Sequence, residues 1–229
     1  MNTHKKPVIF CDFDGTITEN DNIIAIMKHF QPAGWEQIVE KIMNKEISIR
    51  QGVGDLFALL PSEKKQDIVT FAIEQARIRD GFEALLQYCQ QEEISFYVTS
   101  GGIDFFVYPL LAPYPIEKEH IFCNGSSFEG ETIQITWPHA CDAHCTNDCG
   151  MCKTKIMRSF DQAAYDRILI GDSITDFAGA KLADLVFARS YLKTQCEKEG
   201  IPYIAYEDFH TVVEALKTRK ASASVKPSV

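Results

Sequence analysis

The chain has 229 residues, of which 45% are hydrophobic and 24% are charged, and its formal net charge is −9. A chain of this length and composition can bury a sizeable core, which excludes disordered and collagen-like proteins. The acidic balance argues against a nucleic-acid partner, because such a partner needs a basic face. Apolar runs fall short of the roughly 18 residues that span a membrane, and the N-terminus lacks the pattern of a signal peptide, so we expect a cytoplasmic protein without a membrane partner.

The first predicted element is a short buried strand over residues 7–11, which ends where two aspartates begin. From residue 21 to residue 79 the apolar residues instead recur at the spacing of amphipathic helices. Three helices are expected there, over 35–43, 53–60 and 68–76.

Strands and helices alternate after residue 80. The expected elements are helices at 82–89, 103–109, 153–160 and 209–216, strands at 94–99, 167–170, 185–188 and 203–205, and a hairpin at 132–137. This alternation predicts an α/β fold with a doubly wound parallel sheet and a small helical cap inserted after the first strand. The predicted organisation is a core of residues 1–20 and 80–216, a cap of residues 21–79, and a frayed tail of residues 217–229.

Polar groups follow four of the predicted strands, the position at which a doubly wound sheet binds its ligands. Asp12 and Asp14 are two carboxylates separated by one residue, and Gly15 permits a sharp turn after them. Close carboxylates repel each other unless they share a proton or a cation such as Mg2+. The alternative interpretation of this run is an aspartate-rich turn that has no ligand.

A second acidic pair, Asp172 and Asp176, follows the strand at 167–170. Asp172 is a candidate third group of the metal site, and Asp176 is a candidate for orienting it. The alternative is a helix start, at which Asp176 would favour the helix dipole. Both interpretations are compatible.

Ser100 and Gly101 precede an expected helix start, where a hydroxyl and backbone N–H groups can seat an anion. Lys153 supplies the positive charge that a phosphate group needs in an acidic protein. Lys155 is a neighbour that could be confused with it, and for either lysine the alternative is a solvated charge on a helix.

The four groups occur in the order of the four motifs of the haloacid dehalogenase superfamily, whose members include aspartyl-phosphate phosphatases. The pattern D-x-D-G-T spans residues 12–16, Ser100 and Lys153 follow, and G-D-x-x-x-D spans residues 171–176. The chain resembles this superfamily over most of its length, including the helical insertion after the first strand. The S-G-G form of the second motif is similar to the phosphoserine phosphatase branch.

The resemblance implies a phosphatase that hydrolyses a small phosphomonoester with Mg2+. Asp12 would be the nucleophile that forms an aspartyl phosphate, and Asp14 would act first as acid and then as base. Mg2+ would be held by Asp12, the backbone carbonyl of Asp14, and Asp172. The phosphate oxygens would be held by Ser100, Gly101 and Lys153.

Two further residues have positions similar to those that contact substrate in the phosphoserine branch. These are Asp21, shortly after the first motif, and Arg50 in the cap. For Asp21 the alternative is the N-cap of a helix that begins near Ile23.

The loop at 139–152 is rich in cysteine. Cys141, Cys145, Cys149 and Cys152 form a C-x3-C-x3-C-x2-C pattern that could hold a structural Zn2+, with His139 and His144 nearby. A redox-sensitive disulfide and free thiols are the alternatives.

Two other functions are weighed against a phosphatase. A phosphoacceptor module of the receiver type lacks both a cap and an acid placed two residues after the nucleophile. A phosphomutase would have to keep the aspartyl phosphate away from water. Among phosphatases, phosphoserine, phosphocholine and phosphoethanolamine are alternative substrates, the last two because Cys152 directly precedes Lys153 in a manner similar to their phosphatases.

Overall fold

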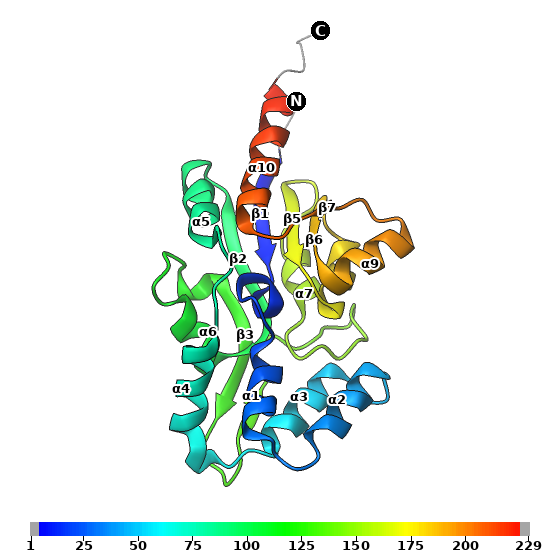
Figure 1. Cartoon of the computed structure of the whole chain (residues 1–229). Coiled ribbons are helices and arrows are strands. Elements are labelled where there is room, and N and C mark those ends of the chain that lie inside the picture. The colour runs from blue at the N-terminus through cyan, green and yellow to red at the C-terminus, as the bar shows by residue number, and fades with distance from the viewer. Residues whose placement is uncertain (1–4, 225–229) are drawn as a thin grey trace.

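One seven-stranded sheet organises residues 5–224, the part of the chain that the computed structural model describes (Figure 1). Its strand order is β4-β3-β2-β1-β5-β6-β7, and all neighbouring strands are parallel except β3 and β4. The strands are β1 (Lys6–Cys11), β2 (Ser95–Ile103), β3 (Ile121–Ser127), β4 (Gln134–Thr136), β5 (Tyr165–Gly171), β6 (Leu185–Ala188) and β7 (Ile204–Ala205). The predicted doubly wound α/β fold is therefore confirmed.

The central strand β1 is buried on both faces, which explains its uninterrupted apolar run. Ile9 and Cys11 belong to one hydrophobic cluster, whereas Val8 and Phe10 belong to another, as the two-residue period of a strand requires. The first cluster is covered by α5 (Phe82–Gln91), α6 (Asp104–Leu111) and α10 (Phe209–Ser224). The second is covered by α7 (Lys153–Arg158), α8 (Phe177–Ala180) and α9 (Ser190–Glu199). No helix in residues 5–224 is both long and apolar enough to cross a membrane.

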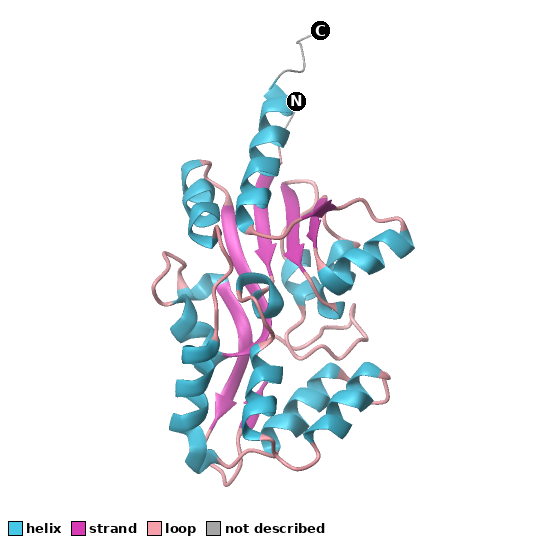
Figure 2. Ribbon diagram, in the orientation of Figure 1, coloured by secondary structure: helices cyan, strands magenta, loops and turns pink. Residues whose placement is uncertain are grey.

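Four helices occupy the segment between β1 and α5 (Figure 2). They are α1 (Asn22–Phe30), α2 (Trp35–Met43), α3 (Ile49–Ala58) and α4 (Lys65–Gln75). The apolar spacing predicts the last three, and α1 matches the helix near Ile23 that the alternative interpretation of Asp21 expects. Phe57 of α3 packs edge-on against Phe105 of α6, with ring centroids 5.8 Å apart. The hydrophobic core thus runs continuously from these helices to the sheet, and the division into core and cap stays an interpretation.

Two differences from the predicted elements lie near the site. Strand β2 continues to Ile103, so Ser100 and Gly101 are strand residues, and α6 begins at Asp104, one residue after the expected start. Strand β3 has no counterpart among the predicted elements, because Asn124, Gly125 and two serines obscure its apolar pattern. It is nevertheless held in the sheet by parallel pairing with β2.

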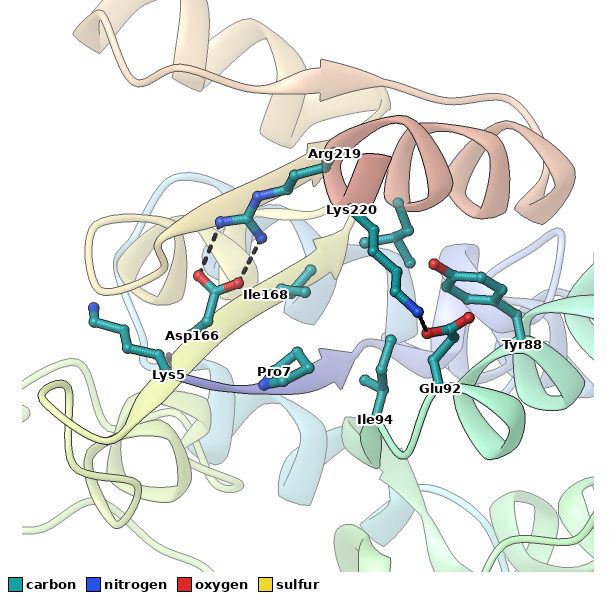
Figure 3. Close-up of a pocket in the computed structure, with 10 residues that line it drawn as sticks. Lys5, Pro7, Tyr88, Glu92, Ile94, Asp166, Ile168, Arg219 and Lys220 are labelled. Carbon is teal, nitrogen blue, oxygen red and sulfur yellow. Dashed lines mark hydrogen bonds and ion pairs between the residues drawn. The ribbon is translucent and has the colours of Figure 1, made fainter. Parts of the chain in front are cut away.

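The expectation of a frayed tail from residue 217 is wrong up to Ser224, because α10 continues to that residue. Arg219 donates two hydrogen bonds to the carboxylate of Asp166 on β5, at 2.6 and 2.9 Å (Figure 3). This bidentate contact between the guanidinium and the carboxylate holds the last turns of α10 against the sheet. Because the two residues are far apart in the sequence, the periodicity of apolar residues could not predict it. The remaining part of the predicted tail, residues 225–229, lies outside the described residues.

Candidate active site

The candidate site lies at the carboxyl ends of three adjacent strands. Cys11 of β1 pairs with Val98 of β2 on one side and with Ile170 of β5 on the other. The residues that follow, which include Asp12 and Asp172, therefore reach the same edge of the sheet. The chain fills the sheet outward from β1 through β2 to β4, and then returns to the other side of β1 as β5. This reversal of strand order is where open α/β sheets bind ligands.

Asp12 is buried at the end of β1. Its Oδ1 accepts a hydrogen bond from the Phe13 N–H at 2.8 Å and lies 2.8 Å from the Nζ of Lys153. Burial and the nearby Asp176 carboxylate raise the pKa of Asp12, and the Lys153 ammonium opposes that rise. A carboxylate in this position needs further positive charge to be a reactive anion.

Lys153 is the first residue of α7, and its ammonium group is buried between two aspartates. Its Nζ contacts Asp176 Oδ1 at 2.5 Å in addition to Asp12. The second oxygen of Asp176 accepts hydrogen bonds from the backbone N–H and the hydroxyl of Ser173, at 3.0 Å each. One oxygen of Asp176 thus holds the Lys153 ammonium in position, and the other caps the helical turn that follows Ser173. Lys155 instead donates to the Ala140 carbonyl at 3.1 Å, which separates the two lysines.

The two oxygens of Asp14 have different surroundings. Oδ1 accepts hydrogen bonds from the backbone N–H of Asn22 at 3.0 Å and from its side-chain amide at 2.7 Å. Oδ2 is buried and has no hydrogen-bond partner within residues 5–224. Burial, followed by the negative charge of Asp21, raises the pKa of Asp14 to about 7. Oδ2 is therefore the oxygen that can carry a proton near neutral pH.

Asn22 is a site residue that the sequence reasoning missed. Its side chain is fully buried and donates to Asp14, as described above, and its amide oxygen Oδ1 accepts a hydrogen bond from the side-chain amide of Gln75 at 2.9 Å. The feature of the sequence that could have indicated this role is the position of Asn22 directly after Asp21, at the start of a helix. Asp21 does cap α1, accepting the Ile24 N–H at 3.0 Å.

Asp172 follows β5 and faces the turn after β1. Its Oδ1 accepts a hydrogen bond from the Thr16 hydroxyl at 2.9 Å. Burial and Asp176 raise the pKa of Asp172 to about 6. Carboxylate oxygens of Asp12, Asp172 and Asp176 all lie within 4.8 Å of one another. The raised pKa values of Asp12 and Asp172 mean that these carboxylates lack enough nearby positive charge to stabilise their ionised forms. A group of carboxylate oxygens of this kind fits a hard divalent cation.

A second missed residue, Arg79, holds the turn that carries Asp14. Its buried guanidinium donates to the backbone carbonyls of Thr16 at 2.8 Å, Gly15 at 2.9 Å and Thr18 at 3.2 Å. Three carbonyls satisfied by one cation fix the path of the chain beside the site. A lone arginine after a helix carries no sequence signal for this role.

Ser100 and Gly101 lie beside the aspartates, and α6 begins at Asp104, one residue after the expected helix start. Their role as a phosphate seat stays a prediction. The buried Ser100 hydroxyl accepts the Gly102 N–H at 2.8 Å. A Cβ on Gly102 would lie 2.5 Å from Asp14 Oδ2. The serine hydroxyl and the carboxyl group of Asp14 thus flank one glycine, and Ser100 remains a candidate phosphate contact.

Arg50 contacts the cysteine-rich loop in this structure. Its guanidinium lies 3.4 Å from Asp148 Oδ1 and 5.8 Å from the centre of the Trp137 ring. Its contact with substrate, like that of Asp21, stays a prediction.

A separate pocket of about 510 Å3 lies at the opposite, amino ends of β1 and β5 (Figure 3). Its charged groups already pair with one another, Arg219 with Asp166 and Lys220 with Glu92. Lys5, which also lines the pocket, pairs with Asp184. The pocket therefore lacks a buried unpartnered carboxyl oxygen such as Oδ2 of Asp14.

Changing Gly15 to alanine should disrupt the site without unfolding the protein. Gly15 has a φ of +77°, and a Cβ there would lie 2.4 Å from Asp172 Oδ2. We expect kcat/KM to fall at least about 100-fold, since misplacement of reacting groups by about 1 Å costs that much. Gly34→Ala is the matched control, because Gly34 has a φ of +91° and no atom within 4 Å of its Cβ position. Equal losses in both variants would show that backbone strain alone is responsible.

The family model of haloacid dehalogenase-like hydrolases matches residues 9–181. A relative from Brevibacillus brevis, named 2-hydroxy-3-keto-5-methylthiopentenyl-1-phosphate phosphatase, is 54% identical over 213 residues, which is 93% of this chain and 96% of the relative. A protein of the same name from Geobacillus kaustophilus is 51% identical over the same shares of the two chains.

Solved structures with the same fold include a phosphoserine phosphatase that carries an analogue of its phospho-aspartyl intermediate. It has a TM-score of 0.68 and 18% identity, with 93% of this chain and 99% of that chain covered. A probable phosphoserine phosphatase from Vibrio cholerae has a TM-score of 0.73 and 17% identity, with 98% and 68% covered. At these identities the structures support the fold alone. The family match and the two relatives decide the assignment: the chain belongs to the haloacid dehalogenase-like hydrolase family.

Proposed function

We propose that this protein is a Mg2+-dependent phosphatase that removes phosphate from 2-hydroxy-3-keto-5-methylthiopentenyl-1-phosphate, a step of methionine salvage, through an aspartyl-phosphate intermediate. The observation that carries the chemistry is the buried Asp12 carboxylate, held 2.8 Å from Lys153 and beside Asp14 and Asp172. The substrate rests on the relatives that share about half of their residues with this chain over nearly their whole lengths. The runs Asp12–Asn22 and Cys149–Lys153 resemble the same phosphatase.

The residues present fit a magnesium ion. Asp12, Asp172 and the backbone carbonyl of Asp14 would hold it, whereas Asp176 is already engaged by Lys153 and Ser173. Bound Mg2+ would supply positive charge to the transferring phosphoryl group.

Asp12 performs the first step. Its Oδ1 is engaged by Phe13 and Lys153, so we assign Oδ2 as the oxygen that attacks phosphorus. The new O–P bond replaces the bond from phosphorus to the substrate oxygen, which leaves as the dephosphorylated product. Lys153 and Ser100 hold equatorial oxygens of the phosphoryl group, which stabilises the charge there.

Asp14 moves the protons. In the first step its Oδ2–H protonates the departing oxygen, and in the second the resulting carboxylate takes a proton from the water that attacks the aspartyl phosphate. Phosphate and free Asp12 are the products, and Asp14 is again protonated. A pKa of about 7 suits both roles. The departing oxygen of this substrate is enolic and thus more acidic than an alcohol, which reduces the demand on Asp14.

The contacts of the two candidate specificity residues favour this substrate over phosphoserine or phosphocholine. Asp21 is used in capping α1, and Arg50 pairs with Asp148. A zwitterionic head group would have to compete with these contacts for both residues, and a charge that becomes buried without a partner is costly. An apolar methylthio tail needs no such partner.

Steady-state kinetics on four substrates tests the proposed function. We expect kcat/KM for the methylthiopentenyl phosphate to exceed that for phosphoserine, phosphocholine and phosphoethanolamine by at least about 100-fold, the discrimination expected when charged groups lack partners. A higher value for any of the other three would overturn the substrate assignment. Failure to hydrolyse all four, with Mg2+ present, would count against the phosphatase itself.

Removal of Mg2+ should stop turnover. Exhaustive treatment with EDTA leaves Asp12 and Asp172 without the positive charge that their burial demands, so we expect activity to fall to background. Adding Mg2+ back should restore it, whereas adding Ca2+ should not, since Ca2+ favours larger and more flexible ligand sets. Full activity in the chelated protein would refute the metal assignment.

A further inference from the structure

Four cysteines that take no part in the proposed chemistry gather in the loop between β4 and α7. The sulfur atoms of Cys141, Cys145, Cys149 and Cys152 all lie within 4.8 Å of one another. The Cys141–Cys145 separation is 3.5 Å and the Cys145–Cys149 separation is 4.0 Å. All four are free of disulfide bonds. Four sulfur atoms this close together are the arrangement expected of ligands that share one metal ion.

We propose that this cluster is a structural zinc site in which all four ligands are cysteine thiolates. A tetrahedral site with Zn–S bonds of about 2.3 Å has sulfur-to-sulfur edges of about 3.8 Å. The two separations given above bracket that length. A disulfide would join only two of the sulfurs and would leave the convergence of the other two unexplained.

The surroundings of the sulfurs suit thiolates. The backbone N–H of Cys149 donates to the sulfur of Cys141 at 3.3 Å, a contact that stabilises negative charge on a ligand. Four thiolates around Zn2+ carry a net charge of −2. Two cations of α7 are fastened to the same loop, Lys155 through the Ala140 carbonyl at 3.1 Å and Arg158 through Asp142 at 2.6 Å. The Lys155 ammonium, which contacts a neutral carbonyl, would offset part of that charge, whereas Asp142 already balances Arg158.

The nearby histidines are less suited as ligands. The His139 ring packs edge-on against Phe122, with centroids 5.1 Å apart, and the His139 carbonyl accepts the Cys152 N–H at 2.9 Å. His144 is exposed on the loop. The convergent groups are thus the four sulfurs.

The proposed zinc site lies in a loop that contacts α3 at one side and leads into Lys153 at the other. Cys152 directly precedes Lys153, the first residue of α7. At the other side of the loop, Asp148 accepts a hydrogen bond from the Ser48 hydroxyl at 2.6 Å, and its carbonyl accepts the Arg50 N–H at 3.1 Å. Figure 1 shows this loop between α7 and the α2–α3 pair. A metal that closes the loop would fix the start of α7 and the docking of α3 together.

Metal analysis of the full chain, purified under reducing conditions without chelators, tests the proposal. We expect about one zinc per chain, and an X-ray absorption spectrum with four sulfur neighbours at about 2.3 Å. Cys145→Ser should reduce the zinc content at least about tenfold, as loss of one of four ligands does for closed sites. Cys89→Ala, which removes a buried cysteine of α5, should keep its zinc and is the matched control.

A second measurement decides the matter if Cys145→Ser does not fold. Titration of the native protein with an organic mercurial should release zinc in proportion to the thiols blocked. Replacement by Co2+ should produce the intense thiolate-to-cobalt absorption of a tetrahedral sulfur site. Reduced native protein that contains no zinc and takes up none from added Zn2+ would overturn the proposal, as would a spectrum with nitrogen or oxygen ligands. These readouts use no substrate, so they are independent of the proposed function.

Discussion

Replacing Asp12 by asparagine should lower kcat/KM at least about 10,000-fold, the loss typical when a covalent nucleophile is removed. The amide can still accept the Phe13 N–H, so the fold should persist, but it cannot attack phosphorus. Native enzyme quenched in acid during turnover should contain an acid-stable, alkali-labile acyl phosphate. The variant should contain none.

Asp67→Asn is the matched control, because Asp67 is exposed in the first turn of α4 and touches none of the site residues described above. We expect its activity to stay within about twofold of the native value, as for surface substitutions generally. Near-normal turnover by Asp12→Asn would place the nucleophile elsewhere.

Replacing Lys153 by methionine should damage both activity and stability. The Lys153 ammonium is buried between Asp12 and Asp176, so its loss leaves two buried carboxylates facing each other. Removing one partner of a buried ionic cluster costs about 3–5 kcal/mol in the free energy of unfolding. We expect kcat/KM to fall at least about 1,000-fold, since an electrostatic contact to the phosphoryl group is lost as well. Urea denaturation and steady-state kinetics would measure the two effects.

The stability loss should depend on pH. Burial raises the pKa of Asp12, and in the variant the Lys153 ammonium no longer opposes that rise, so the folded-state pKa of Asp12 lies further above the unfolded value. A carboxyl group whose pKa is higher in the folded state than in the unfolded state destabilises the folded state at pH values above the unfolded-state pKa. The effect disappears at low pH, where the group is protonated in both the folded and the unfolded state. The deficit of Lys153→Met should therefore shrink as the pH falls from about 8 to about 5. A deficit independent of pH would point to lost packing rather than lost charge.

Two controls separate charge from geometry. Lys155→Met removes a lysine two residues along α7, whose Nζ donates to the Ala140 carbonyl and not to the aspartates of the site, and should change kcat/KM less than about threefold. Lys153→Arg keeps the charge but should restore little activity, because a planar guanidinium does not fit a buried point-charge position. Full activity in Lys153→Arg would show that charge suffices.

Local patterns account for the parts of the molecule that the sequence predicts correctly. The apolar run before Asp12 reflects the full burial of one short strand. The helical spacing of Trp35, Ile38, Val39 and Ile42 reflects a helix that packs one partly buried face against the core. Strand β3 and the last turns of α10 were not predicted, because they are held by contacts with segments that are distant in the sequence. Their order comes from pairing with β2 and from the contact of Arg219 with Asp166, which no local window contains.

The alternation of strands and helices was enough to predict the doubly wound fold. It was also enough to predict that the four motifs meet, because parallel strands bring the residues after each strand to one edge of the sheet. The pairing of the side chains within the site became visible in the folded molecule. The tertiary structure seats Lys153 between Asp12 and Asp176, places Asn22 on one oxygen of Asp14, and closes the turn with Arg79. These contacts depend on distances between segments that are remote in sequence, and packing of the whole core sets those distances.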